Sequence, residues 1–442
     1  MRRSKRCFLL GMLICSIVVT VSCVGFQGSL FEIKPDGSIG PIIAGVEITF
    51  VSEDGSVTRT VTTNSAGRYR IALSPRRYVV TAAHPGYYDY SSAPGFFVVT
   101  GEGYQTGNIF MRKRHADLLM ITTSLLDKEP SFEDIVNRYQ GVLFEAEGLN
   151  AGYIELDSDN CLRTFGVRVT NPGDWEEIRG VLREIIGMAE ASYIMILGGP
   201  LVVPRPVVDA CCTEGGNPIA VPSDAWYLDF DNDQIVDEGL SISRMPDLSH
   251  SSAAVVIALQ TAIELHNRGG YTLDNPVRFT MHDYATPPYG VCGACERMDE
   301  FFELMSTRDY IHIAGHGSPT AIYSNYGDLM FSIDYMDSIN LQDCHPVIIA
   351  YGPCSAGVLD PNSSTLSYEF MKAGAAAYVA RTTTLGVPGY VGRDFPGDIE
   401  GVMRIGPALF QAMRQTALDY GDTFKAPAGQ ICLYGDPTLW RH

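Results

Sequence analysis

Short runs of apolar and β-branched residues, each followed by polar turn residues, recur along the chain and predict many short strands. In the first quarter of the sequence, the runs are separated by Asp-Gly, Asn-Ser-Ala-Gly and Ser-Pro turns. They cover residues 46–51, 58–62, 67–73 and 77–82. Strands at such regular spacing are typical of a small antiparallel sandwich, so we expect an all-β domain over residues 28–113.

From about residue 116 the apolar runs alternate with amphipathic segments, which indicates an α/β fold with a mainly parallel sheet covered by helices. A helix is predicted to start at Ser131, where Ser131 and Asp134 resemble a capping box, and another covers 174–190. The segment 244–275 is expected to be a helix and a linker between two subdomains, 116–250 and 275–442. The predicted strands are 117–122, 152–156, 193–197, 277–281, 310–314, 347–351 and 375–380.

Two of these strands end in glycine-containing turns that carry a reactive side chain. His316 follows the strand 310–314, and Cys354 follows the strand 347–351. Parallel strands that end side by side would bring both side chains to the same edge of the sheet. A thiol becomes a good nucleophile when a neighbouring base makes it a thiolate, so the pair predicts acyl transfer. Taken singly, each has an ordinary alternative, a buried small cysteine and a loop-capping histidine.

Several sequence blocks, in the same order, resemble the gingipain family of cysteine peptidases, which are relatives of caspases and legumains. The first two are Gly-His-Gly-Ser at 315–318 and Cys-Ser-Ala-Gly at 354–357. The likeness covers about residues 116–442. The chain departs from the family at Pro353, Pro319 and Ser243, which leaves the substrate preference open. The remaining blocks are Ser-Asp-Ala-Trp-Tyr at 223–227, Ser-Arg-Met-Pro at 243–246 and Gly-Asp-Pro at 435–437.

The resemblance implies a caspase-like fold in which Cys354 is the nucleophile and His316 the base. It also implies that backbone amides of Gly317 and Cys354 hold the oxyanion, where the glycine lets the substrate approach closely. A third group should orient the imidazole, and Asp283, at the end of a predicted strand, is our candidate. A helix-capping or solvated role for Asp283 stays open.

In this family, acids near the helix before the histidine strand can select a basic P1 side chain. The matching stretch offers Glu296 or Asp299, which would favour cleavage after Arg or Lys. Either residue could instead be an acid in a first helical turn, where the helix dipole favours it.

Oxygen-bearing side chains alternate along one loop, as they do in calcium-binding loops. The loop lacks the glycine and the distant glutamate of an EF-hand. Because family members often bind calcium, a structural calcium ion is one interpretation of this loop, and a plain polar loop is the default one. No cofactor is required for the chemistry. The candidate ligands are Asp229, Asp231, Asp233 and Asp237.

The first residues resemble a signal peptide, predicted over 1–22. Residues 1–6 are basic and residues 7–21 form an apolar core that is too short for an ordinary membrane span. Residues 20–23, Thr-Val-Ser-Cys, resemble a bacterial lipobox with Cys23 as the lipid anchor; cleavage and release is the alternative. We therefore expect an exported protein, either a cell-envelope lipoprotein or secreted, that meets a membrane only through this anchor.

The amino-acid composition limits the classes of molecule that the protein can bind. The chain of 442 residues has a net charge of −19, which argues against binding to a nucleic-acid backbone. Its hydrophobic fraction of 46% and charged fraction of 19% are those of a well-cored globular protein.

Turns at 54–55, 63–69 and 85–87 make the first domain resemble a carboxypeptidase-regulatory-like or collagen-adhesin B-type module, which implies a spacer or stabilising role.

Together these observations predict an exported cysteine endopeptidase that acts on protein or peptide substrates through a thioester. Two alternatives remain. A transpeptidase that processes surface proteins would use the same Cys–His dyad and thioester, but pass the acyl group to an amine. A surface adhesin with an inactive peptidase domain would be non-enzymatic, although the presence of both His316 and Cys354 speaks against it.

Overall fold

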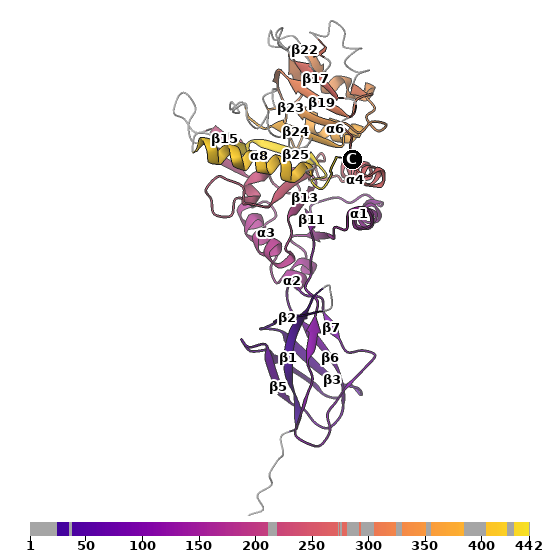
Figure 1. Cartoon of the computed structure of the whole chain (residues 1–442), viewed down its shortest axis with the longest axis vertical. Coiled ribbons are helices and arrows are strands. Elements are labelled where there is room, and N and C mark those ends of the chain that lie inside the picture. Colours follow the sequence, from indigo (N-terminus) through magenta and orange to yellow (C-terminus); the bar gives the residue numbers. More distant parts are fainter. Residues whose placement is uncertain are drawn as a thin grey trace, which may run out of the picture. The chain divides into compact units, whose positions relative to one another are not determined.

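The protein is seen in a computed structural model, which divides into two compact units, Met1–Lys113 and Arg114–His442 (Figure 1). We call them the β unit and the α/β unit, and describe each by itself. The structure describes residues 24–34, 38–210, 219–272, 274, 276–280, 291–292, 305–323, 329–350, 355–383, 404–421 and 428–441.

In its described residues, the β unit contains two five-stranded sheets. One has the order β10-β1-β2, with β5 and β9 also paired to β1, and the other has the order β4-β3-β6-β7, with β8 paired to β6. The strands are β1 (Gly25–Ile33), β2 (Ile39–Ile42), β3 (Glu47–Ser52), β4 (Thr58–Thr62), β5 (Arg68–Ala72), β6 (Arg77–Ala83), β7 (Tyr90–Ser91), β8 (Phe97–Val98), β9 (Tyr104–Thr106) and β10 (Ile109–Met111).

The core of the β unit follows from alternation along its strands. In β3, β5 and β6 every second side chain is buried, as in a sheet that covers a core with one face. Phe50, Tyr69 and Tyr78 lie in this core with ring contacts between them. The four predicted strands are confirmed as β3 to β6. The sandwich is not purely antiparallel, however, because β1 pairs in parallel with β9 and β10.

The α/β unit is built on a ten-stranded sheet in the described residues, with the order β12-β11-β13-β16-β25-β24-β23-β19-β17-β18. Smaller sheets are formed by β14 with β15 and by β20, β21 and β22. The strands are β11 (Leu118–Thr122), β12 (Ala151–Glu155), β13 (Tyr193–Leu197), β14 (Val207–Ala210), β15 (Ile219–Pro222), β16 (Ser241–Met245), β17 (Pro276–Thr280), β18 (Val291–Cys292), β19 (Tyr310–Ala314), β20 (His316–Gly317), β21 (Ala321–Tyr323), β22 (Leu329–Ser332), β23 (Val347–Ala350), β24 (Ala377–Arg381) and β25 (Ile431–Gly435).

Helices cover both faces of this sheet. Helix α1 packs on α4 and α4 on α6, while Figure 1 shows α3 and α8 on the other side. None of the helices in the described part of the chain has the length and apolarity that a bilayer crossing requires. The helices are α1 (Phe132–Glu147), α2 (Asp159–Phe165), α3 (Trp175–Ala189), α4 (Ala253–Arg268), α6 (Leu366–Ala373) and α8 (Ile405–Tyr420), with 3-10 turns η1 (Asp224–Leu228) and η2 (Ile333–Ser338).

The large sheet consists of two sets of parallel strands that run in opposite directions. Strands β12, β11, β13, β16 and β25 are parallel to one another, and so are β24, β23, β19, β17 and β18. The sets meet where β24 and β25 pair antiparallel. This caspase-like α/β architecture, which follows a small β-sandwich in the sequence, is the predicted fold class. The carboxyl ends of the second set share one edge of the sheet.

Two local predictions were wrong. Ser131 precedes α1 but makes no side-chain capping bond, because its own backbone is already helical (φ −86°, ψ −5°). Residues 241–245, partly assigned to a helix and linker, form the buried central strand β16. Their pattern hid the strand because serines and an arginine stand among the apolar residues. The helix predicted at 174–190 is confirmed as α3, and the Asp174 side chain accepts the amides of Glu176 and Glu177.

Candidate active site

His316 lies at the carboxyl edge of the second set of strands. β19 and β23 are parallel neighbours, with Tyr310 opposite Val347 and His312 opposite Ile349, so both strands end at this edge. His316 follows β19 after a single glycine and opens β20, which pairs with β21. Its side chain is exposed, so it is accessible to a substrate.

Cys354 belongs to residues 351–354, which follow β23 and lie outside the described residues. The chain is described again from Ser355, which has a φ of 58°. A left-handed backbone is uncommon for a residue with a side chain and is held only where its surroundings fix it. The Ser355 amide donates to the Thr383 carbonyl (3.4 Å), just beyond the end of β24. The chain therefore resumes at the edge that β23 and β24 share.

The turn at Ser355–Gly357, which we call the post-cysteine turn, is fixed by buried groups. The Ala356 carbonyl accepts hydrogen bonds from the hydroxyls of Tyr378 (3.2 Å) and Ser367 (3.2 Å). The Gly357 amide donates to the Arg381 carbonyl (2.6 Å). A Cβ atom at Gly357 would lie 2.8 Å from that same carbonyl oxygen, so this close approach requires glycine.

Arg205 holds the other end of the post-cysteine turn. The Gly357 carbonyl accepts hydrogen bonds from the Tyr434 hydroxyl and from Nη1 of Arg205 (3.2 Å). Nη2 of Arg205 bonds the Tyr434 oxygen (2.6 Å), and the same nitrogen lies 3.5 Å from Asp224. Burial raises the pKa of Tyr434, so its hydroxyl stays protonated and able to donate. Arg205 was not among the predicted site residues; its only signal in the sequence is a proline on each side.

Two of the family-like blocks meet in a buried ion pair behind Arg205. The Asp224 carboxylate accepts Nε (2.9 Å) and Nη2 (2.6 Å) of Arg244. Nη1 of Arg244 donates to the carbonyls of Gly198 (3.0 Å) and Val203 (2.9 Å). Burial alone would raise the pKa of Asp224, but Arg244 and Arg205 outweigh it and lower that pKa. The pair therefore stays charged and holds the loop that carries Arg205.

Other predicted site residues are only partly described. Gly317, predicted for the oxyanion, lies half-buried in β20 opposite Ile322. The remaining members of the predicted site lie outside the described residues. These are the orienting Asp283, the pocket acids Glu296 and Asp299, and the anchor Cys23.

The acidic loop gathers three of its four predicted ligands. Carboxylate oxygens of Asp229, Asp231 and Asp233 all lie within 4.8 Å of one another. Asp237 instead accepts the amide of Phe230 (2.9 Å). Burial, helped by Asp233 and Asp231, raises the pKa of Asp229 to about 6. Carboxylates gathered in this way fit a hard cation such as calcium.

Asp436 of the Gly-Asp-Pro block belongs to a buried hydrogen-bond network. Asp436 is fully buried and accepts the hydroxyls of Tyr139 (2.6 Å) and Thr438 (2.6 Å). It also lies 2.8 Å from Nε2 of His266, whose Nδ1 lies 3.2 Å from Glu147. These contacts join α1 and α4 to the end of β25, away from the strand ends that carry His316.

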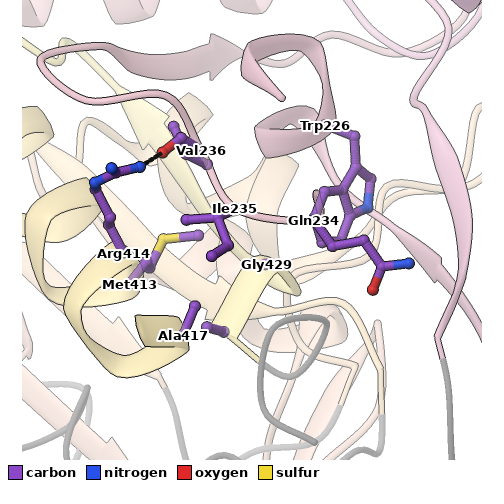
Figure 2. Close-up of a pocket in the computed structure, with 9 residues that line it drawn as sticks. Trp226, Gln234, Ile235, Val236, Met413, Arg414, Ala417 and Gly429 are labelled. Atoms are coloured by element: carbon purple, nitrogen blue, oxygen red, sulfur yellow. Dashed lines mark hydrogen bonds between the residues drawn. The ribbon is translucent and has the colours of Figure 1, made fainter. Parts of the chain in front are cut away.

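A small pocket between α8 and the loop after η1 contains no convergent polar groups (Figure 2). Its cavity volume of about 10 Å³ holds roughly one water molecule. Arg414 closes one side by donating to the Val236 carbonyl (2.8 Å). Trp226 lies on the other side, and Gly429 gives its ring room. This pocket is a packing feature, not a ligand site.

The opposed parallel strand sets and the histidine-bearing strand end define the class as a caspase-like α/β protein. Comparison with solved structures identifies the fold more closely. The chain is 15% identical to the Arg-specific cysteine proteinase gingipain R, with a TM-score of 0.54 over 74% of this chain and 78% of that one. A complex of the pro- and mature domains of RgpB from Porphyromonas gingivalis gives the same score and identity over 73% and 79%. The α/β unit therefore has the gingipain-type fold.

The β unit has its own match. Residues 36–111 match the carboxypeptidase regulatory-like domain family, as expected from their turn pattern. Among curated proteins, none matches this sequence.

Proposed function

We propose that this protein is an exported cysteine endopeptidase in which Cys354 is the nucleophile and His316 its base. The observation that carries the proposal is the parallel pairing of β19 with β23 in a gingipain-type fold. Parallel strands that end side by side bring the residues after them to one edge of the sheet, so this pairing supports an imidazole and a thiol close together. The exposure of His316 supports its access to a peptide.

In the acylation step, His316 takes the proton of Cys354 and the thiolate attacks the scissile carbonyl carbon. The backbone amides of Gly317 and Cys354 stabilise the oxyanion. As the C–N bond breaks, His316 protonates the leaving amine and a thioester remains.

In the deacylation step, His316 accepts a proton from water, which attacks the thioester carbonyl. The C–S bond breaks, the acid product leaves and Cys354 is regenerated. Asp283 orients the imidazole during both steps, and Glu296 or Asp299 selects Arg or Lys at P1. Protein and peptide chains are thus the partners, and no cofactor takes part in the chemistry.

We place a structural calcium ion at Asp229, Asp231 and Asp233, supported by their mutual distances and the raised pKa of Asp229. A chelator should lower the thermal unfolding midpoint of the wild type, but not that of a D231N/D233N variant. Equal lowering in both would exclude this site.

The signal-like residues 1–22 support export, with Cys23 as the lipid anchor of an envelope protein. Mass spectrometry of the mature amino terminus tests this. A diacylglyceryl group on Cys23 is expected, whereas an unmodified terminus beyond Cys23 indicates release into the medium.

Covalent labelling with a panel of peptidyl acyloxymethyl ketones tests the dyad. The wild-type thiolate should displace the carboxylate of the reagent and form a stable thioether. C354A should not be labelled, and H316A should be labelled more slowly, because the thiolate loses its base.

C344A and H84A are matched controls. Burial raises the pKa of Cys344 to about 11, so this thiol is unreactive near neutral pH, and His84 belongs to the β unit. Both controls should be labelled like the wild type. Labelling of the wild type that survives in C354A, or its absence from the wild type, would contradict the proposal.

A further inference from the structure

We propose that Arg205 is a positioning residue that fixes the post-cysteine turn and thereby the geometry of the nucleophile, an inference that rests on the proposed function. Arg205 comes from the first set of strands and their loops, whereas the turn follows β23 in the second set. One buried guanidinium thus connects the two halves of the α/β unit at the residues that follow Cys354.

The turn needs such a device because its backbone is unfavourable by itself. Ser355 has a φ of 58°, and Gly357 approaches a neighbouring carbonyl too closely for any side chain. The carbonyls of Ala356 and Gly357 point at buried hydroxyls and a guanidinium. Satisfying these carbonyls away from water stabilises this turn over alternatives that would leave them unpaired.

The chemistry of Arg205 suits this role better than that of lysine. Its planar fork reaches the Gly357 carbonyl, the Tyr434 oxygen and the Asp224 carboxylate together, which a single ammonium cannot match. Its side chain is only 6% exposed. Asp224, already paired with Arg244, supplies the negative charge that lets a second guanidinium be buried there.

Arg205 also carries a cost that stability alone does not explain. Its Nε is buried without a hydrogen-bond partner among the described residues. An unsatisfied buried donor weakens folding, so this nitrogen gives the arginine no advantage in stability. A role in positioning the post-cysteine turn explains why an arginine occupies position 205.

The test compares the inactivation of full-length R205M, R205K and Y434F by one peptidyl acyloxymethyl ketone. A displaced nucleophile lowers kinact but leaves KI nearly unchanged, because the peptide still binds. We expect kinact to fall about tenfold to hundredfold in R205M, as for a small misplacement of a reacting group. R205K should recover only part of this loss. R414M is the matched control, since Arg414 also donates to a buried loop carbonyl, that of Val236, which is not part of the turn.

Tryptophan fluorescence and urea unfolding show whether each variant is folded. If R205M is unfolded, the kinact values of R205K and Y434F test the inference. Arg205 and Tyr434 both donate to the Gly357 carbonyl. The fold-loss of kinact in the R205M/Y434F double variant should therefore be smaller than the product of the two single losses. A kinact in R205M and Y434F equal to that of R414M would overturn the inference while leaving the proposed function intact. A wild type that is not labelled would instead overturn the proposed function, and the inference with it.

Discussion

Arg244 is a fully buried arginine whose role is set by its partners. Its guanidinium spans the Asp224 carboxylate and two loop carbonyls, so the charge and most of its donors are satisfied. A buried pair of this kind is nearly neutral for stability when intact and strongly destabilising when one partner is removed. The Asp and Arg of the two sequence blocks therefore have a structural function, whatever the reaction.

R244M should lower the free energy of unfolding by about 3–5 kcal/mol, because it removes the main partner of buried Asp224. The control is R168M, which breaks an ion pair with exposed Asp159 and should change the free energy by less than about 1 kcal/mol. Urea unfolding followed by tryptophan fluorescence measures both. Equal midpoints for the two variants would show that the buried pair contributes nothing.

His266 provides a pH-dependent contribution at the same scale. Burial would lower its pKa, but the hydrogen bonds and charges of Asp436 and Glu147 outweigh burial and raise it. A raised folded-state pKa means that the stabilisation is complete below the unfolded pKa of about 6.5 and is lost as the pH rises through the folded value.

The stability advantage of wild type over H266Q should therefore shrink as the pH rises above about 6.5, the unfolded pKa. Urea unfolding at several pH values measures this advantage. An advantage for His266 that grows with pH would contradict the assigned charge state.

At the scale of elements, the segment before β25 packs on Trp226 of η1. The indole donates to the Val221 carbonyl (2.9 Å), and its ring lies against Gly429 (Figure 2). A Cβ atom at Gly429 would be 2.1 Å from Trp226 Cη2, so this contact depends on the missing side chain. The glycine thereby fixes how the start of β25 meets η1.

G429A should cost about 1–3 kcal/mol through overpacking and shift the tryptophan emission. G141A gives the opposite sign. A Cβ atom at Gly141 in α1 meets nothing within 4 Å, so alanine should stabilise the helix by about 0.5–1 kcal/mol. Two substitutions of the same kind thus separate close packing from helix propensity. A neutral G429A would contradict the contact.

At the scale of the whole molecule, the two units are built by different rules. The β unit buries alternate residues between two sheets, whereas inner strands of the ten-stranded sheet, such as β13, β23 and β24, are buried on both faces. In the α/β unit, the opposed strand sets put the carboxyl ends of β19, β23 and β24 at one edge. That edge carries His316 and the post-cysteine turn, so the topology puts these two features on the same side of the sheet.

Sequence patterns predicted the elements with strong periodicity and missed those that depend on distant partners. The runs at 193–197 and 310–314 became β13 and β19 with unchanged bounds, because continuous apolar residues suit a buried strand. Strand β16 was missed because a buried arginine reads as polar until Asp224 is known to neutralise it. The role of Arg205 could not be predicted, since its partners Tyr434 and Gly357 lie 229 and 152 residues away.

The central claim is peptide-bond hydrolysis by Cys354, and cleavage of a peptide library in ¹⁸O-labelled water tests it most directly. The account predicts new carboxyl termini carrying ¹⁸O, produced by the wild type and absent with C354A, because water resolves the thioester. Mass spectrometry would read the P1 residue from the same products. Products joined to an amine without ¹⁸O would mean transpeptidation, and cleavage no greater than that of C354A would contradict the claim that this protein is a peptidase.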